Sequence, residues 1–360
     1  MQEFSSRTKI ICGTGAVSAL KDLKAQRLFL VTDPYFAKNG VAEKIAQMSQ
    51  ASAVEIFQDV VPDPSVSLAA EGTARVKAFH PDVVVALGGG SAMDCAKAML
   101  YFSAISARLV AIPTTSGSGS EVTDFAILTH EGIKHPLVDP RLAPELAILD
   151  DDLLHNLPKT LVADAGFDVL AHALEALVGS TASPITDALA KDAFCTAFAA
   201  LPASFGGQIH GRQKVHMAAT MAGMAFTQAG LGLCHGLAHA LGGRFHVPHG
   251  RLNAVLLPAV ISCNAHVAGE KYASVARAVG LGGSADTVAV RNLRNGLIRL
   301  RKELELPDTL ARAGIPPREL WHDMDKIVRG TLEDPCCRTN PMKVEDFMVR
   351  KVLEEVMGSV

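Results

Sequence analysis

The sequence predicts an α/β domain built on a parallel sheet, followed by an all-α domain. Short apolar runs alternate with helical stretches over residues 1–156, which is typical of a parallel sheet covered by helices. Strand-like runs then disappear, and residues 157–360 carry long helical stretches rich in Ala, Gly and Met. The length of 360 residues exceeds one average domain and suits two. We therefore expect two domains that meet between residues 156 and 157.

The predicted strands of the first domain are short apolar runs that end in acidic, glycine or proline-containing turns. Mixed apolar and charged stretches between them are interpreted as covering helices. A segment rich in proline and acids, residues 134–154, is expected to lead out of the domain. The strand-bearing runs are residues 27–33, 53–61, 82–90, 108–120 and 145–150, and the helices are residues 40–50 and 69–80.

The predicted helices of the second domain are apolar nearly all round. Such helices are buried and closely packed, because no face is left for water. We expect them at residues 160–179, 183–205, 214–230, 252–264 and 271–281.

Composition and charge exclude several classes of protein. The chain is 49% apolar, so a large core needs no disulfides. A net charge of −3 without a basic stripe argues against nucleic acid, and no apolar run reaches the roughly 18–20 residues that span a bilayer. The first residues lack the apolar segment of a signal peptide, and the seven cysteines form no C-x-x-C pair. We expect a cytoplasmic protein with reduced thiols, the adjacent Cys336 and Cys337 included.

A glycine turn after a predicted strand is a candidate phosphate site. The segment GGGSAMDCAK places Gly88, Gly89 and Gly90 where a backbone can approach a phosphate, at the start of a helix with its N–H donors. We expect Ser91 to be the N-cap and Asp94 to lie in the first turn. The turn is not G-x-G-x-x-G, so an ordinary tight turn remains the alternative.

A second loop, PTTSGSGSE, follows the next predicted strand. It offers the hydroxyl groups of Thr114, Thr115 and Ser118 and the amides of two glycines. Loops at the carboxyl ends of neighbouring parallel strands flank the crevice where open α/β sheets bind ligands. The loop lacks the lysine of a P-loop, which argues against an NTPase.

Asp33 ends the predicted strand RLFLVTD. A carboxylate in this place can bond to ribose hydroxyls and repel a 2′-phosphate, which favours NAD over NADP. The alternative is a surface turn residue.

One carboxylate and three imidazoles in the second domain form a candidate metal site. Asp168 and His172 are four residues apart and share one face of a predicted helix, while His235 and His249 bracket CHGLAHALGGRFHVPHG. This set satisfies a divalent transition metal, although any single histidine can be an ordinary core residue. His239 shares a helical face with His235, which suits a proton relay or simple packing. His246 stays unassigned.

Taken together, the motifs VTD, GGGSAMDCAK, IPTTSGSGSEVT, FDVLAHALEA and HGLAHALGGRFHVPHGRLNA resemble the iron-containing (group III) alcohol dehydrogenases along nearly the whole chain. The subgroup that AGMAFTQAGLGL and CRTNP resemble is the 1-propanol dehydrogenases of propanediol-utilisation microcompartments. The resemblance implies a Rossmann-like NAD domain, a helical metal- and substrate-binding domain, and an active site in the cleft between them. It further implies a homodimer, short-chain aliphatic aldehydes or alcohols as substrates, and residence among other microcompartment enzymes.

The resemblance also implies roles for individual residues. Fe(II), sometimes replaced by zinc, would be held by Asp168, His172, His235 and His249. Asp63 stands where some relatives carry asparagine, so its role is open. The implied NAD(H) contacts are Asp33, Asp63, Gly89, Gly90, Ser91, Asp94, Thr114, Thr115, Ser118 and Lys134.

Three other readings of the sequence stay open. One is a zinc-dependent glycerol or diol dehydrogenase. Another is an NAD-using, metal-dependent lyase of the dehydroquinate-synthase type, in which NAD is regenerated. The last is a non-catalytic, metal-storing or structural role, against which the glycine turn and Asp33 argue.

Overall fold

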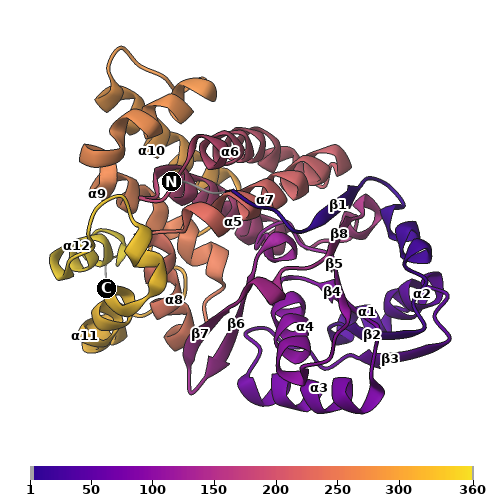
Figure 1. Cartoon of the computed structure of the whole chain (residues 1–360). Coiled ribbons are helices and arrows are strands. Elements are labelled where there is room, and N and C mark those ends of the chain that lie inside the picture. The colour runs from indigo at the N-terminus through magenta and orange to yellow at the C-terminus, as the bar shows by residue number, and fades with distance from the viewer. Residues whose placement is uncertain (1–3, 359–360) are drawn as a thin grey trace. The chain divides into compact units, whose positions relative to one another are not determined.

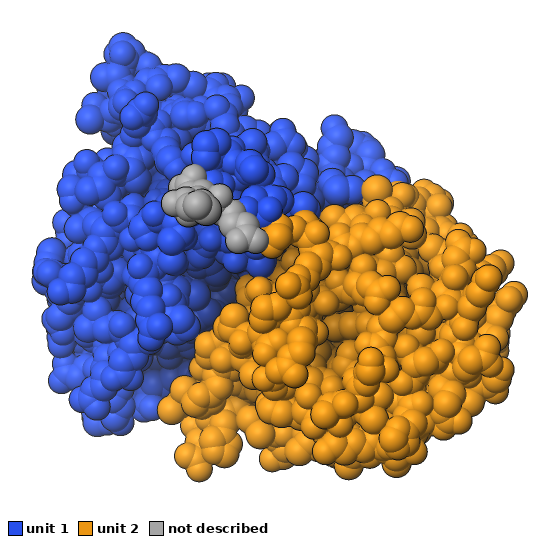
Figure 2. All heavy atoms as spheres, viewed as in Figure 1, with its two compact units in different colours: residues 1–4, 158–360 blue, residues 5–157 orange. Residues whose placement is uncertain are grey.

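The computed structural model describes residues 4–358, which form two compact units (Figures 1 and 2). One unit consists of residues 5–157 and the other of Phe4 with the chain from Pro158 onward. The first unit is α/β and the second is helical, so the predicted fold class is confirmed.

A six-stranded, all-parallel sheet forms the centre of the α/β unit. Its strand order is β1-β8-β5-β4-β2-β3. The chain runs from β2 outward to β3, then returns to β4 on the other side of β2, so the direction of winding reverses between β2 and β4. The strands are β1 (Lys9–Cys12), β2 (Arg27–Val31), β3 (Ala53–Phe57), β4 (Val83–Gly88), β5 (Arg108–Pro113) and β8 (Leu146–Leu149).

Helices cover both faces of this sheet because its central strands are apolar on both sides. Leu30 and Val85 point to one face and pack against η1 (Ala16–Leu23) and α2 (Val41–Met48). Val31, Val84 and Ala86 belong to the cluster on the other face, which includes side chains of α3 (Val66–Phe79) and α4 (Gly90–Ser103). Packing on both faces therefore fixes the positions of β2 and β4, whose carboxyl ends lie side by side in the sheet.

Four of the strands and α-helices of this unit escaped the sequence prediction. β1 is an edge strand of four residues, and α1 (Pro34–Lys38) is a helix of five. A separate antiparallel pair joins β6 (Phe125–His130) to β7 (Ile133–Val138), and β7 overlaps the start of the segment interpreted as a passage out of the domain. Pro136 argued against a strand there, but proline is tolerated in a two-stranded pair that has free edges.

The second unit is a bundle of helices, most of which follow the predicted stretches. α5 and α6 begin and end within one or two residues of the predicted ranges. The helices are α5 (Lys159–Val178), α6 (Pro184–Phe205), α7 (Ile209–Ala229), α8 (Leu233–Phe245), α9 (His249–Ala278), α10 (Asp286–Glu303), α11 (Pro317–Glu333) and α12 (Asp346–Val356), with short 3-10 turns elsewhere such as η5 (Pro335–Thr339).

The prediction of two separate helices at residues 252–264 and 271–281 was wrong, because α9 is one helix of 30 residues that runs through Pro258. Proline has no N–H, so the carbonyl of Ala254 lacks its normal partner in the helix. The buried guanidinium of Arg301 on α10 donates to that carbonyl oxygen at 3.2 Å, and to that of Val255 at 3.5 Å. An external donor therefore lets the helix continue past its proline.

α9 is also the one described helix that is long and apolar enough to cross a bilayer by length and composition. Most of its apolar window, 67%, is buried among its neighbours, as in the core helix of a packed bundle.

His216 on α7 makes stability depend on pH. Burial lowers the pKa of His216 to about 4, from an ordinary value of 6.5. Between these two values the unfolded chain binds a proton that the folded chain does not, so stability falls as the pH drops from 6.5 to 4.

In urea unfolding, we expect His216→Gln to lose less stability than the wild type over this window, by about 3 kcal/mol. His210→Gln, at an exposed position on the same helix, is the control. Equal pH slopes for wild type and His216→Gln would contradict the prediction.

Candidate functional site

The glycine turn lies between β4 and α4. Gly88 ends the strand with φ 150°, Gly89 is the N-cap in extended backbone, and α4 begins at Gly90. The prediction that Ser91 is the N-cap was wrong, and Asp94 lies in the second turn, so the first turn contains no acid. Gly89 makes no side-chain cap hydrogen bond. The helix N-terminus therefore presents backbone donors without an acid in its own first turn, an arrangement that suits a phosphate.

The second predicted loop packs directly against this turn. The backbone N–H of Thr114 donates to the carbonyl oxygen of Gly88 at 3.0 Å. A Cβ placed on Gly89 would lie 3.0 Å from Oγ1 of Thr115, and one on Gly90 would lie 3.2 Å from the side chain of Ser118. The missing Cβ at these two glycines thus leaves room for the hydroxyls of one loop to approach the backbone of the other.

Asp33 joins the turn from the neighbouring strand β2. Its Oδ1 caps α1 by accepting from the N–H groups of Tyr35 and Phe36, at 2.9 and 3.2 Å. Its Oδ2 lies 3.7 Å from the position of a Cβ on Gly88. Asp33 and Gly88 therefore meet where the winding of the sheet reverses, which is the point where open α/β sheets bind ligands.

A buried lysine holds the second loop in place. Nζ of Lys97 donates to Oγ of Ser120 and to both the carbonyl oxygen and Oγ1 of Thr123, at 2.9–3.2 Å. Ser120 Oγ in turn lies 3.1 Å from Oδ1 of Asp94. Burial raises the pKa of Asp94 to about 6 and lowers that of Lys97 to about 8. Asp94 thus supports the loop through Ser120, a role that the sequence did not suggest.

Asp63 and Lys134 form an ion pair of 2.8 Å. The backbone of Asp63 is left-handed, with φ 52°, a conformation that Asp and Asn tolerate best among residues other than glycine. The opposite charges of these two predicted cofactor contacts therefore neutralise each other.

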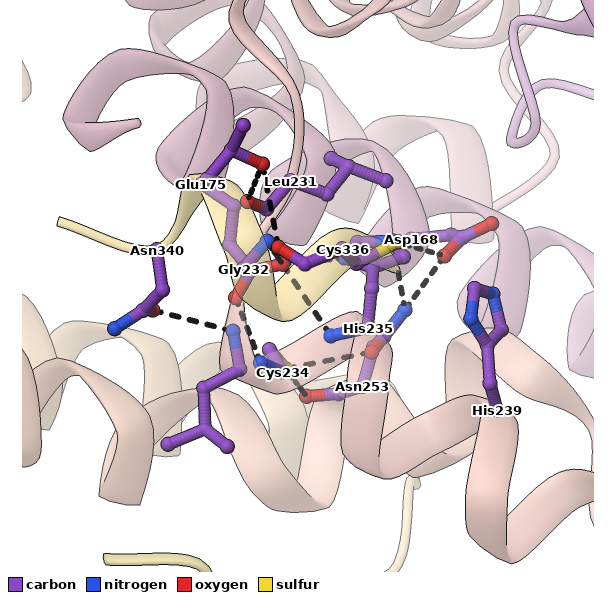
Figure 3. A network of polar contacts seen from close by, with 12 residues as sticks. Asp168, Glu175, Leu231, Gly232, Cys234, His235, His239, Asn253, Cys336 and Asn340 are labelled. Carbon is purple, nitrogen blue, oxygen red and sulfur yellow. Dashed lines mark hydrogen bonds and ion pairs between the residues drawn. The ribbon is translucent and has the colours of Figure 1, made fainter. Parts of the chain in front are cut away.

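In the helical unit, the four predicted metal ligands come together from the helices α5, α8 and α9. Figure 3 shows two of them, Asp168 and His235, on neighbouring helices. One ligand atom each of Asp168, His172 and His235 lies within 4.8 Å of the others. Nε2 of His249 lies 3.6 Å and Nε2 of His235 lies 3.7 Å from Oδ1 of Asp168. The ring of His172 stacks between those of Phe226 and His235, with centroids 4.5 and 4.4 Å away. Stacking against these two neighbouring rings therefore fixes the orientation of the His172 ring.

The amide nitrogen of Asn253 lies beside three potential ligand atoms of this cluster. It donates to Oδ1 of Asp168 at 2.7 Å, and it lies 3.4 and 3.3 Å from Nε2 of His235 and of His249. One carboxylate oxygen and two ring nitrogens from three helices therefore converge on one small region. This donor set, a carboxylate with imidazoles, fits a divalent transition metal such as iron or zinc.

Glu175 is a functional residue that the sequence reasoning missed. Its buried Oε2 accepts a hydrogen bond of 2.6 Å from Nδ1 of His235, which leaves Nε2 of that ring facing Asp168. Its carboxylate also accepts from the backbone N–H groups of Gly232, Cys234 and His235 at the start of α8. The available signal was spacing, because Glu175 follows Asp168 by seven residues and so shares its side of α5.

The acid and the histidines of the cluster shift each other's pKa values. Burial opposes a charge on His235, but hydrogen bonds to Asp168 and Glu175 raise its pKa to about 9. Burial likewise opposes ionisation of Asp168, yet the nearby His172 and His249 hold its pKa well below the usual range. A metal-free cluster therefore keeps protons that a metal must displace.

Gly250 allows the close approach of α9 to α5. A Cβ at this position would lie 1.9 Å from the carbonyl oxygen of Asp164 and 3.3 Å from Cβ of Asp168. Any larger residue would push His249 away from Asp168.

His239 lies one turn from His235, and its ring stacks on that of His249 with centroids 5.1 Å apart. Its Nδ1 bonds to Oδ2 of Asp334 at 2.9 Å, an interaction for which the sequence gave no local signal. His246 is exposed, in left-handed backbone at the end of α8.

Two family models match the chain. The model for the iron-containing alcohol dehydrogenases covers residues 7–151, and the model for the C-terminal part of the Fe-containing alcohol dehydrogenase family covers residues 162–357. The 1-propanol dehydrogenase PduQ of Citrobacter freundii is 40% identical over 99% of this chain and its own full length. The NADPH-dependent butanol dehydrogenase of Clostridium saccharobutylicum is 35% identical over 98% of this chain and 97% of its own.

Solved structures of similar proteins have the same fold as this chain. The iron-containing alcohol dehydrogenase of Thermococcus thioreducens superposes with a TM-score of 0.91 at 31% identity, over 98% of this chain and 99% of that one. A 1,3-propanediol oxidoreductase superposes with a TM-score of 0.93 at 29% identity, over 99% and 100% of the two chains.

Proposed function

Because the chain belongs to the iron-containing alcohol dehydrogenase family, we propose that it interconverts short-chain aliphatic aldehydes with their alcohols, using NAD(H) as hydride carrier. Membership makes the protein an oxidoreductase that uses a nicotinamide cofactor and iron. Propionaldehyde and acetaldehyde are the proposed substrates, and the similarity to 1-propanol dehydrogenase PduQ supports the first of them.

We propose Asp168, His172, His235 and His249 as the ligands of Fe(II), with zinc as a possible substitute. The convergence of three ligand atoms on the Asn253 amide is the observation that carries this proposal. A bound Fe(II) would supply a Lewis acid that polarises the carbonyl oxygen of the substrate. Glu175 orients His235 for this purpose, and Gly250 lets His249 reach the same centre.

In the α/β unit, we propose that the glycine turn binds the pyrophosphate of the cofactor. Backbone donors at Gly89, Gly90 and Ser91 suit this role, and Thr115 and Ser118 line the same turn. Asp33 would hold the ribose hydroxyls. The remaining proposed cofactor contacts are Asp63, Asp94, Thr114 and Lys134.

One assay tests the proposed reaction. NADH absorbance should fall when the protein loaded anaerobically with Fe(II) meets propionaldehyde, and it should not fall with metal-free protein. A second candidate substrate is a diol, which the likeness to a 1,3-propanediol oxidoreductase supports. Turnover of 1,3-propanediol but not of 1-propanol would favour that candidate, and no net change in NADH with any substrate would contradict both.

Asp33 should decide between the two nicotinamide cofactors. Asp33→Ser removes the charge that repels a 2′-phosphate but keeps a side-chain oxygen that can cap α1. We expect the ratio of kcat/KM for NADPH to that for NADH to rise about 10-fold, a change of about 1.4 kcal/mol. Asp22→Ser, an equal change of charge at an exposed position on η1, should leave the ratio unaltered. An unchanged ratio in Asp33→Ser would remove Asp33 from cofactor selection.

His239 is the proposed proton relay to and from the substrate oxygen, with Asp334 fixing its ring. His239→Gln should leave iron bound and slow turnover by on the order of 10²-fold, because general acid–base groups contribute on this scale. Metal analysis and the pH dependence of kcat test both parts, with His266→Gln on α9 as the control. Wild-type rates at every pH would exclude His239 from the mechanism.

We also propose that the protein is a homodimer located in the cytoplasm, inside a bacterial microcompartment with the enzymes that act before or after it. The similarity to 1-propanol dehydrogenase PduQ along the whole chain supports this proposal. Light scattering of the purified protein and fractionation of cells test its two parts.

A further inference from the structure

A second cluster of potential metal ligands lies beside the proposed iron site. His239 on α8 comes together with Asp334 and Cys336, which belong to the junction between α11 and η5. One ligand atom of each residue lies within 4.8 Å of the other two. All three side chains are partly buried, and none of them belongs to the proposed iron ligands. The cluster offers a nitrogen, an oxygen and a sulfur atom.

The backbone holds these three groups in place. Oδ2 of Asp334 accepts from Nδ1 of His239 at 2.9 Å, and its Oδ1 accepts from the backbone N–H of Cys336 at 2.8 Å. The ring of His239 is fixed from its other side by its stacking on His249. Pro335 stands between the acid and the thiol and restricts the backbone that joins them. Little ordering is therefore left for a ligand to impose.

We propose that His239, Asp334 and Cys336 form a second cation site, which takes a thiophilic divalent ion of the Zn²⁺ and Co²⁺ class. The ion would replace the proton between Nδ1 and the carboxylate and the proton on the thiol. Imidazole, carboxylate and thiolate are the three ligand types that zinc uses in proteins. Hard ions such as Mg²⁺ prefer oxygen ligands and should not compete.

Sulfur distinguishes this site from the proposed iron site. The iron ligands are one carboxylate and three imidazoles, so an ion held there has no thiolate ligand. Cys234 is the other thiol to consider, because its Sγ lies 3.3 Å from Oδ1 of Asn253. Replacement of Cys234 therefore belongs in any test.

Occupancy of the second site should inhibit the enzyme. The ion would take the Nδ1 lone pair of His239 and remove the Nδ1–H···Asp334 hydrogen bond that orients the ring. This consequence rests on the proposed relay role of His239, whereas binding of the ion does not. An experiment can therefore contradict the relay role of His239 without contradicting binding of the ion, and the reverse is also true.

Cobalt provides the direct test, because Co²⁺–thiolate bonds absorb strongly in the near ultraviolet and Co²⁺ bound only by nitrogen and oxygen does not. Titration of the anaerobic iron-loaded enzyme with Co²⁺ should produce a thiolate band that saturates at one equivalent. Zn²⁺ should bleach the band. Cys336→Ser should abolish it, and His239→Gln should weaken Co²⁺ binding about 10–100-fold.

Two matched variants complete the experiment. Cys234→Ser and Cys263→Ser should keep the band, since the first lies by the iron site and the second is a partly exposed thiol on α9. Absence of the band in the wild type, or its survival in Cys336→Ser, would overturn the proposal. A band without inhibition of turnover would uphold the site and contradict the relay role of His239.

Discussion

Replacement of Asp168 or His249 by alanine is expected to abolish both iron binding and turnover. Each residue supplies one of the atoms that converge on the Asn253 amide, and Asp168 is the only carboxylate among the proposed ligands. A Lewis acid contributes several kcal/mol of stabilisation to the developing charge, so kcat/KM should fall by at least about 10³-fold. Iron content of anaerobically purified protein and NADH oxidation measure the two effects.

Two further variants make this expectation specific. Asp168→Asn keeps the size of the side chain and removes its charge, so it should lose iron while the protein stays folded. His246→Ala alters an exposed histidine of the same segment and should keep iron and activity. A metal-free His249→Ala protein that turned over at the wild-type rate would refute the proposed iron site.

Glu175→Gln should both destabilise the protein and weaken iron binding. The carboxylate accepts from three backbone N–H groups and from Nδ1 of His235, all in a buried setting. An amide nitrogen in place of one oxygen would face donors and leave them without an acceptor. We expect the free energy of unfolding to fall by about 3 kcal/mol and the affinity for iron to fall about 10–100-fold.

Urea unfolding and competition with a chelator measure these two quantities. Glu270→Gln, at an exposed position on α9, is the matched control and should change neither. If Glu175→Gln kept the wild-type iron affinity, the carboxylate would not act through His235.

The sequence predicted the parts of the fold that local patterns determine. Runs such as residues 83–88 are apolar on both faces, so a buried parallel strand was the natural interpretation. β1 and β7 escaped because an exposed four-residue strand and a strand with an internal proline carry almost no such signal. The predicted break at residues 265–270 was wrong, because α9 continues through these residues as one helix, just as it continues through Pro258.

The same distinction applies to the candidate site. Asp168 and His172 were found through their spacing on one helix, and so was the relation of His235 to His239. Asp334 could not be found in this way, since it lies 95 positions beyond the histidine it contacts. Serine favours the N-cap, so the sequence predicts Ser91 at that position, but the structure has Gly89 there, without a side-chain cap on the helix N-terminus.

Pro258 and Arg301 also constrain how this chain can change during evolution. While the proline is present, loss of the arginine leaves the buried carbonyl oxygen of Ala254 without this hydrogen-bond donor. The free energy of unfolding should then fall by about 1–3 kcal/mol. Once alanine replaces the proline, the helix can satisfy that oxygen itself, and the arginine becomes dispensable. The order of the two mutations therefore matters, and related sequences that keep proline at this point should also keep arginine at its partner position.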